Sequence, residues 1–405
     1  KQKKKSEMIH YFDNDYEIPD KTEWQPNDAT LNYYYLQTAN LRHNLGSMYK
    51  VNPSQQPSTF KKALESHKVI DREMAGGTIF SYLYFDDGAV VYDALPPKDR
   101  FKAKLNNSSY FPSHSMGKSI TSYLIGHAIC QGYIESIDEP IHDWPLMEST
   151  LYFGQPLINL LNMKAGDSKV MNRKNHSAFA KTGRGIHGNA PLIRAAQNPL
   201  ELKDTKPIKN PPYWYSNLAA DILFNYMMHR VGNDFDNFIT DFYKSKIKIE
   251  YPVYLWMNPT TTNSTKIRIK EGAGQYGISA TRYDFLRIAK AIMDDWQNDT
   301  CEGQYLKEIY DRRVRTQRKS ISWNSLQDDG RHHAFMDTSA KYGGQFWTDF
   351  NGLWNKNILV MNGYNGQEIA IDMDNSRIVV ISAVKSNHYN TKKLGYEPIK
   401  YGRIR

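Results

Sequence analysis

The chain has 405 residues, of which 40% are hydrophobic and 23% charged, and its formal net charge is +9 at pH 7. This length allows a large buried core in one or two structural lobes. The positive charge is dispersed, no nucleic-acid-binding motif is recognised, and no apolar run reaches the roughly 18 residues of a membrane span. No metal-ligand spacing occurs, so no metal or cofactor is predicted. A disulfide between Cys130 and Cys301 is not expected.

The N-terminal quarter of the chain changes character near residue 70. Residues 1–70 are polar and lack periodicity, which predicts an irregular segment that wraps the surface. Two runs of β-branched and aromatic residues then follow, at 79–85 and 89–92, with Asp86-Asp87-Gly88 between them. This pattern is typical of a β-hairpin.

Ser115 begins the most informative segment. The residues from Met116 to Cys130 are apolar at helical spacing, and Gly132 is a typical helix terminator. Ser115 is therefore expected at the N-terminus of a largely buried helix, where free backbone N–H groups favour developing negative charge. Lys118 follows on the same helix face and can reach the serine oxygen, so the pair could act as nucleophile and base. The same Ser-x-x-Lys spacing recurs without this helical setting at Ser47/Lys50, Ser58/Lys61, Ser245/Lys248 and Ser382/Lys385.

The segment Tyr215-Ser216-Asn217 carries further candidates. Asn210-Pro211-Pro212 imposes an extended chain before it, and residues 218–229 have a strongly apolar helix pattern. Tyr215 and Asn217 are therefore expected on a loop at a helix start, where functional side chains are often presented. In the alternative interpretation Asn217 is only the N-cap of that helix and Tyr215 a packing residue.

The C-terminal part returns to strands. Apolar runs of strand length occur at 358–361, 369–371 and 378–381. The segment from Gly363 to Gln367 interrupts the first strand, and Asp374-Asn375 forms a turn before the last. The glycines permit close approach of the backbone to a ligand, although a bulge in an antiparallel sheet is the alternative.

From about Phe111 to its end, the chain resembles the serine hydrolases related to class C β-lactamases and penicillin-recognising enzymes. This family includes esterases, D-amino-acid peptidases and 6-aminohexanoate-dimer hydrolases. The resemblance is carried by the motifs above, in their order, and by segments 118–140, 158–166, 272–284 and 342–347. It implies the β-lactamase/transpeptidase-like fold of the α/β (α+β) class, with an antiparallel sheet flanked by helices and an inserted, mainly helical lobe. It also favours a periplasmic or other extracytoplasmic location.

The order of strands and helices predicts which parts of the chain form each lobe. Residues 71–110 and 331–405 would build the sheet lobe, and residues 111–330 would form the mainly helical lobe. A cleft between the two lobes is the expected place for a site.

The resemblance assigns catalytic roles to four residues. Ser115 is the nucleophile, and Lys118 takes its proton, with a pKa that is depressed if the amine is buried. Tyr215 passes the proton to the leaving group, and Asn217 orients Lys118 and the substrate.

The last active-site strand of this family supplies the other groups. The backbone N–H groups of Ser115 and Tyr364 would form the oxyanion hole. The substrate would be bound next to the turn residues Gly363, Asn365 and Gly366.

The chain departs from the β-lactamases at their Lys-Thr-Gly motif, where it has Met361-Asn362-Gly363. The lysine that helps to bind the carboxylate of penicillins is therefore absent. A literal Lys181-Thr182-Gly183 precedes Tyr215 and lacks a strand pattern, so it is interpreted as a surface loop.

The sequence thus predicts a serine hydrolase that cleaves an ester or amide bond of a small molecule through an acyl-enzyme at Ser115. A penicillin-binding peptidase or a β-lactamase would use the same site. A catalytically silent binding protein could also have this fold, although the intact set of Ser115, Lys118 and Tyr215 argues against it.

Overall fold

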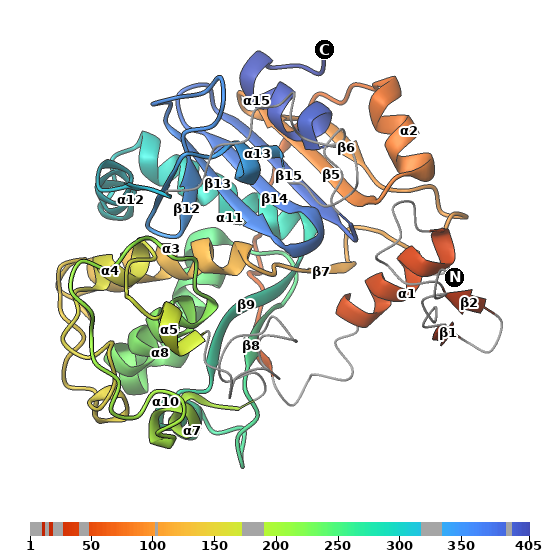
Figure 1. Cartoon of the computed structure of the whole chain (residues 1–405). Helices are drawn as coiled ribbons and strands as arrows, with labels where there is room; N and C mark the ends of the chain where they lie inside the picture. Colours follow the sequence, from red (N-terminus) through yellow and green to blue (C-terminus); the bar gives the residue numbers. More distant parts are fainter. Residues whose placement is uncertain are drawn as a thin grey trace, which may run out of the picture.

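The computed structural model of the chain describes residues 10–12, 16–18, 27–39, 48–101, 104–171, 190–316, 334–385 and 391–405. Two main sheets and the helices around them make up this part of the molecule (Figure 1). The segment Lys181-Thr182-Gly183 lies outside the described residues. Within the described ranges, every helix is too short or too polar to cross a membrane.

The larger sheet combines strands from both ends of the chain. Its nine strands, in spatial order, are β10 (Val314–Arg315), β11 (Lys341–Gly343), β12 (Phe346–Thr348), β13 (Ile358–Gly363), β14 (Gln367–Asp372), β15 (Arg377–Ala383), β5 (Ile79–Asp86), β6 (Ala89–Ala94) and β4 (Lys61–Lys62). All neighbours are antiparallel except the edge pair of β4 and β6. The predicted hairpin is β5 and β6. Strand β15 pairs with β5, so this sheet joins strands that are more than 290 residues apart in sequence.

A smaller sheet leads into the candidate nucleophile. Its four antiparallel strands are β3 (Met48–Val51), β8 (Val253–Met257), β9 (Gly274–Thr281) and β7 (Tyr110–Pro112). Strand β7 ends three residues before Ser115, and β9 is its neighbour. The family pattern suggests that segment 272–284 is a glycine loop followed by a helix start. Most of this segment is strand β9, and helix α11 (Arg282–Gln297) begins after it. A separate two-stranded ribbon is formed by β1 (His10–Phe12) and β2 (Tyr16–Ile18).

The helices form layers on the sheets. Figure 1 shows α13 (Ala334–Thr338) and α15 (Glu397–Tyr401) on one face of the large sheet and α11 (Arg282–Gln297) on the other. Helices α3 (Met116–Cys130) and α8 (Asn217–Val231) pack against each other and on β9. The other α-helices in the described part of the chain are α1 (Asp28–Ala39), α2 (Lys68–Gly76), α4 (Leu157–Leu161), α5 (Ser168–Met171), α7 (Leu192–Gln197), α9 (Phe235–Thr240), α10 (Thr265–Glu271) and α12 (Cys301–Asp311).

Two details differ from the expected arrangement of the lobes. Helix α11 packs on β5, β14 and β15, so residues 111–330 contribute to both layers and are not confined to a helical lobe. The first 70 residues are not irregular throughout, because α1 is a helix of 12 residues. Its Leu31 and Tyr35 are buried, and the Tyr35 hydroxyl donates a hydrogen bond to the carbonyl of Tyr110 at 3.1 Å.

Cys130 and Cys301 form a disulfide, with 5.9 Å between their Cα atoms, so the expectation of unpaired cysteines is wrong. Cys130 is the last residue of α3 and Cys301 is the first residue of α12, and these two helices pack together. The bond therefore joins two helix ends that are 171 residues apart in sequence. Only the packing of the helices reveals the pair, because spacing in the sequence carries no information about it.

The C-terminal interruption is a hairpin turn and not a break within one strand. Strands β13 and β14 are antiparallel neighbours, and the 3-10 turn η8 (Tyr364–Gly366) connects them. Asn365 and Gly366 reverse the chain direction with φ values of 68° and 93°. Tyr364 therefore lies on a turn at the end of β13, and the alternative of a bulge is wrong at this point.

Candidate active site

Lys118 is placed to act as the base for Ser115. Its side chain is only 1% exposed, and its Nζ lies 2.8 Å from Oγ of Ser115. The same Nζ donates a hydrogen bond to Oδ1 of Asn217 at 2.7 Å. Burial lowers the pKa of Lys118 to about 7, against an opposing influence of the negative charge of Asp221. A substantial fraction of neutral amine is therefore present near neutral pH, with a lone pair available for the serine proton.

The turn that carries Ser115 is fixed from two sides. On one side, the backbone of Ser113 bonds to the carbonyl of Ile278 on β9 at 2.8 Å, and the Ile278 N–H returns a bond to Oγ of Ser113 at 2.9 Å. On the other side, Gly363 at the end of β13 packs so closely that a Cβ there would lie 2.5 Å from the carbonyl oxygen of Ser113. The small sheet, the large sheet and α3 thus meet at the nucleophile.

The loop with Tyr215 and Asn217 has its own anchors. Ser216 is the N-cap of α8, because its side chain accepts the N–H of Ala219 at 3.1 Å. The interpretation of Asn217 as the N-cap is therefore wrong, and its side-chain Oδ1 accepts a hydrogen bond from Lys118. The Ser216 hydroxyl also donates to the buried carboxylate of Asp167 at 2.6 Å, which ties the loop to the segment after α4.

Tyr215 forms one wall beside the Lys118 amine. Nζ of Lys118 lies 4.6 Å from the centroid of the Tyr215 ring. The ring stacks on Trp347 of β12 with 5.8 Å between centroids and 21° between planes, and Trp347 is itself buried. The large sheet therefore positions the tyrosine that sequence analysis assigns to proton transfer.

The turn η8 lies beside His114, which precedes Ser115, while its part in an oxyanion hole stays a prediction. The Tyr364 ring is 59% exposed and stands edge-on to His114, with 5.8 Å between ring centroids. Among the described residues, the backbone N–H of Ser115 donates no hydrogen bond, so it is available to a ligand. Asn365 and Gly366 are in the same turn, while their contact with a substrate stays a prediction.

Two further polar residues, which sequence analysis did not assign, lie in this site. The ring of Tyr276 on β9 has its centroid 4.1 Å from Nζ of Lys118, and the charge of Asp221 on α8 acts on Lys118. Asp221 is 2% exposed and follows Asn217 by four residues, so both face the same side of α8. An acidic residue at this helical spacing from Asn217 is a usable sequence signal. Tyr276 has no such signal, because its approach to Lys118 depends on the pairing of β9.

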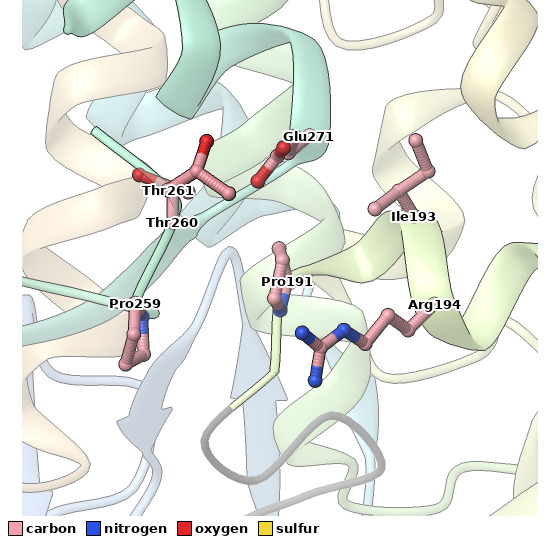
Figure 2. Close-up of a pocket in the computed structure, with 7 residues that line it drawn as sticks. All are labelled: Pro191, Ile193, Arg194, Pro259, Thr260, Thr261 and Glu271. Atoms are coloured by element: carbon pink, nitrogen blue, oxygen red, sulfur yellow. The ribbon is translucent and has the colours of Figure 1, made fainter. Parts of the chain in front are cut away.

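A separate pocket of about 280 Å³ lies between α7, the end of α10 and residues 259–261 (Figure 2). Its charged lining residues are Arg194 and Glu271, and the rest of the lining is apolar or hydroxyl-bearing. None of the residues around Ser115 contributes to it. The pocket lacks a nucleophile with an adjacent base, so we place the candidate chemistry at Ser115.

No family model and no curated protein sequence matches the chain. Its structure, however, is similar to that of a protein assigned as a 6-aminohexanoate-dimer hydrolase from Bacillus anthracis, with 16% identity and a TM-score of 0.60 over 92% of this chain and 94% of the other. A penicillin-binding protein from Bacillus halodurans has 15% identity and a TM-score of 0.52 over 79% and 96%. A D-stereospecific amidohydrolase from Streptomyces sp. has 14% identity and a TM-score of 0.51 over 84% and 99%. The chain therefore has the β-lactamase/transpeptidase-like fold that the sequence predicted.

Proposed function

We propose that this protein is a serine hydrolase that cleaves an ester or amide bond of a small molecule through an acyl-enzyme at Ser115. The observation that carries the proposal is the buried amine of Lys118, 2.8 Å from Oγ of Ser115 and with a pKa of about 7. A lysine that is neutral near pH 7 and adjacent to a hydroxyl is an effective general base. The hydrolase and amidohydrolase named among the similar structures support the same class of reaction.

In the acylation step, the neutral amine of Lys118 removes the hydroxyl proton of Ser115 while Oγ attacks the substrate carbonyl. The carbonyl oxygen becomes negative and is stabilised by the backbone N–H groups of Ser115 and Tyr364. The proton then passes by way of Tyr215 to the leaving alcohol or amine as its bond to the acyl carbon breaks. Asn217 keeps the amine oriented through its hydrogen bond to Nζ.

In the deacylation step, water takes the place of the leaving group. Lys118 accepts a proton from the attacking water, and the same oxyanion donors stabilise the second tetrahedral intermediate. The bond between the acyl carbon and Oγ then breaks, and Lys118 returns the proton to Oγ. The carboxylic acid product leaves, and the resting site is restored.

The groups around the nucleophile support one substrate class. At the position of the β-lactamase lysine, Met361 is fully buried and contributes only an apolar side chain. Recognition of an anionic β-lactam needs a paired charge in the site. The exposed ring of Tyr364 and the nearby rings of His114 and Trp256 instead provide aromatic surface beside Ser115. We therefore favour neutral short-chain esters or small amides as substrates.

The test is labelling with a fluorophosphonate probe followed by peptide mapping, combined with 4-nitrophenyl butyrate hydrolysis. Wild-type protein should be labelled at Ser115, and Ser115→Ala should lose both labelling and hydrolysis while unfolding at the same temperature. Ser58→Ala is the matched control, because Ser58 has the same spacing to a lysine but bonds to the carbonyl of Ile247. Hydrolysis by Ser115→Ala at the wild-type rate would exclude Ser115 as the nucleophile. An unlabelled and inactive wild type would favour a binding protein.

A further inference from the structure

The segment Tyr215-Ser216-Asn217 turns its first and third side chains to one side and its second to the other. Ser216 has φ -133° and ψ 118°, so the chain is extended at this point, and successive side chains of an extended chain point to opposite sides. Nζ of Lys118 lies 4.6 Å from the centroid of the Tyr215 ring and donates to Oδ1 of Asn217 at 2.7 Å. The hydroxyl of Ser216 bonds instead to Asp167. Any group that holds Ser216 therefore also determines where its two neighbours lie.

The side chain that holds Ser216 is a buried carboxyl group. Asp167 is 1% exposed, and its Oδ2 accepts the Ser216 hydroxyl at 2.6 Å. The hydroxyl of Tyr152 donates to the same oxygen at 2.7 Å. Burial raises the pKa of Asp167 above its ordinary value, against the opposing effect of these two hydrogen bonds. A buried carboxyl group is costly when it lacks partners, so Asp167 favours the loop conformation in which the Ser216 bond is made.

The turn before Asp167 brings this carboxyl group to the loop. It follows α4 and contains Met163 and Gly166, whose φ values are 56° and 75°. The carbonyl of Met163 accepts the N–H of Trp214 at 2.8 Å, and its Sδ accepts the N–H of Ser216 at 3.3 Å. Met163 thus fixes the backbone of the loop, and Asp167 supplies a side-chain anchor. A substitution at residue 167 removes that anchor and leaves the two backbone donors with their partners.

We propose that Asp167 is a positioning residue of the active site, which acts through its hydrogen bond to Ser216. This bond keeps the side chains of Tyr215 and Asn217 turned toward Lys118. The proposal rests on the proposed function, in which Tyr215 passes the proton to the leaving group. Without the bond, the loop can rotate about the backbone of Ser216, and the proton path from the amine to the leaving group becomes longer. Asp167 itself takes no part in the proton transfer.

The decisive variants are Asp167→Ala, which removes the acceptor, and Asp167→Asn, whose amide oxygen can still accept the Ser216 hydroxyl. For Asp167→Ala we expect kcat/KM to fall about 3- to 10-fold with 4-nitrophenyl butyrate and about 30- to 100-fold with ethyl butyrate. The two losses differ because ethoxide needs a proton from Tyr215 to leave, whereas nitrophenolate leaves without one. A lower folded fraction would reduce both values by the same factor, so their ratio reports positioning. Asp167→Asn should restore most of both rates.

Ser216→Ala tests the same bond from its other end, and Thr300→Ala is its matched control. Each hydroxyl caps a helix by accepting the N–H three residues later at 3.1 Å. Each also donates to a buried carboxylate, Ser216 to Asp167 at 2.6 Å and Thr300 to Asp295 at 2.9 Å. Ser216→Ala should show the larger loss with ethyl butyrate, whereas Thr300→Ala should lower only the unfolding midpoint. Tyr152→Phe removes the other donor to Asp167, keeps the Ser216 bond and should leave the ratio unchanged.

Tyr215→Phe sets the scale for the selective loss with ethyl butyrate. The double variant of Asp167→Ala and Tyr215→Phe should have the same ratio as Tyr215→Phe alone, because Asp167 acts through Tyr215. If Asp167→Ala does not fold, Ser216→Ala gives the same test with the carboxyl group in place.

The outcomes distinguish this proposal from the proposed function. An unchanged ratio in Asp167→Ala and Ser216→Ala, with a changed ratio in Tyr215→Phe, would refute the role of Asp167 and leave the hydrolase intact. Selective losses that multiply in the double variant would overturn the proposal as well, because Asp167 would then act by a route other than Tyr215. If Ser115→Ala retained hydrolysis, it is the proposed function that would fail.

Discussion

The backbone carbonyl of Tyr276 lies so close to Gly117 that any side chain there would collide with it, since a Cβ would be 2.2 Å from the oxygen. This contact joins β9 to the first turn of α3, between Ser115 and Lys118. The obstacle is backbone and cannot rotate away, so the strand and the helix must separate if residue 117 gains a methyl group.

Gly117→Ala should therefore lower both stability and activity. We expect a loss of about 1–3 kcal/mol in the free energy of unfolding, as for other overpacked sites, and a loss of ester hydrolysis of at least about 10-fold. Urea unfolding and kinetics with 4-nitrophenyl butyrate measure both effects. Gly76→Ala in α2 is the control, because nothing lies within 4 Å of its Cβ position. Full activity in Gly117→Ala would contradict the proposed contact.

The pH dependence of hydrolysis should report the protonation of Lys118. Its pKa of about 7 is lowered by burial, and protonation removes the lone pair that accepts the serine proton. Activity should therefore fall tenfold per pH unit well below that value and level off above it. The measurement is kcat/KM for 4-nitrophenyl butyrate between pH 5 and pH 9. A profile without an acid limb would argue against Lys118 as the base.

Asp221→Asn should move this acid limb to lower pH. Burial lowers the pKa of Lys118, and the negative charge of Asp221 raises it. Removing that charge should therefore lower the pKa of Lys118 further. Asp299→Asn is the control, because Asp299 forms an exposed ion pair with Lys307. A shift of the limb to higher pH in Asp221→Asn would contradict the sign of this interaction.

The buried Lys118 should also destabilise the fold in a pH-dependent way. Its folded pKa of about 7 lies below the ordinary lysine pKa of 10.5, so between these values the unfolded chain binds more protons. Stability of the wild type should then rise with pH in this window, by up to about 1.4 kcal/mol per unit, relative to Lys118→Met. Urea unfolding of both proteins at pH 7, 8 and 9 measures the difference. A difference that is constant with pH would contradict this prediction.

The disulfide between Cys130 and Cys301 should contribute to stability without affecting the chemistry. It closes a loop of 171 residues. The chain-entropy model gives about 5 kcal/mol for a loop of that length, which is an upper estimate. Cys130 is at the far end of α3 from Ser115, about 22 Å along the helix axis. Reduction, or the substitutions Cys130→Ala and Cys301→Ala together, should lower the unfolding midpoint and leave kcat unchanged. Adding reductant to the double variant is the control and should have no effect.

The substrate preference should follow the missing cationic group at Met361. We expect turnover of 4-nitrophenyl butyrate with weak or absent turnover of nitrocefin, because an oxyanion hole serves any acyl carbonyl whereas an anionic β-lactam needs a paired charge. Kinetics with a series of nitrophenyl esters and with nitrocefin measure this. Efficient nitrocefin turnover, well above that of the esters, would show that the predicted substrate class is wrong.

The sequence by itself predicted the elements that depend on local patterns. The hairpin of β5 and β6, helix α3 after Ser115 and helix α8 after Tyr215 all lie where periodicity and turn residues indicated. Such patterns arise from contacts within one element, or between neighbours joined by a short turn, so they are visible in the order of residues. The resemblance to a known family then gave the β-lactamase/transpeptidase-like fold, which the similar solved structures confirm.

The tertiary structure decided the features that depend on distant residues. The disulfide of Cys130 and Cys301, the carbonyl of Tyr276 against Gly117 and the charge of Asp221 near Lys118 each join segments between about 100 and 171 residues apart. The pKa of Lys118 is likewise set by burial under other elements and not by its neighbours in sequence. The sequence shows a serine with a lysine one helical turn later. Only the packing determines whether that lysine is buried enough for its pKa to fall and its amine to act as a base.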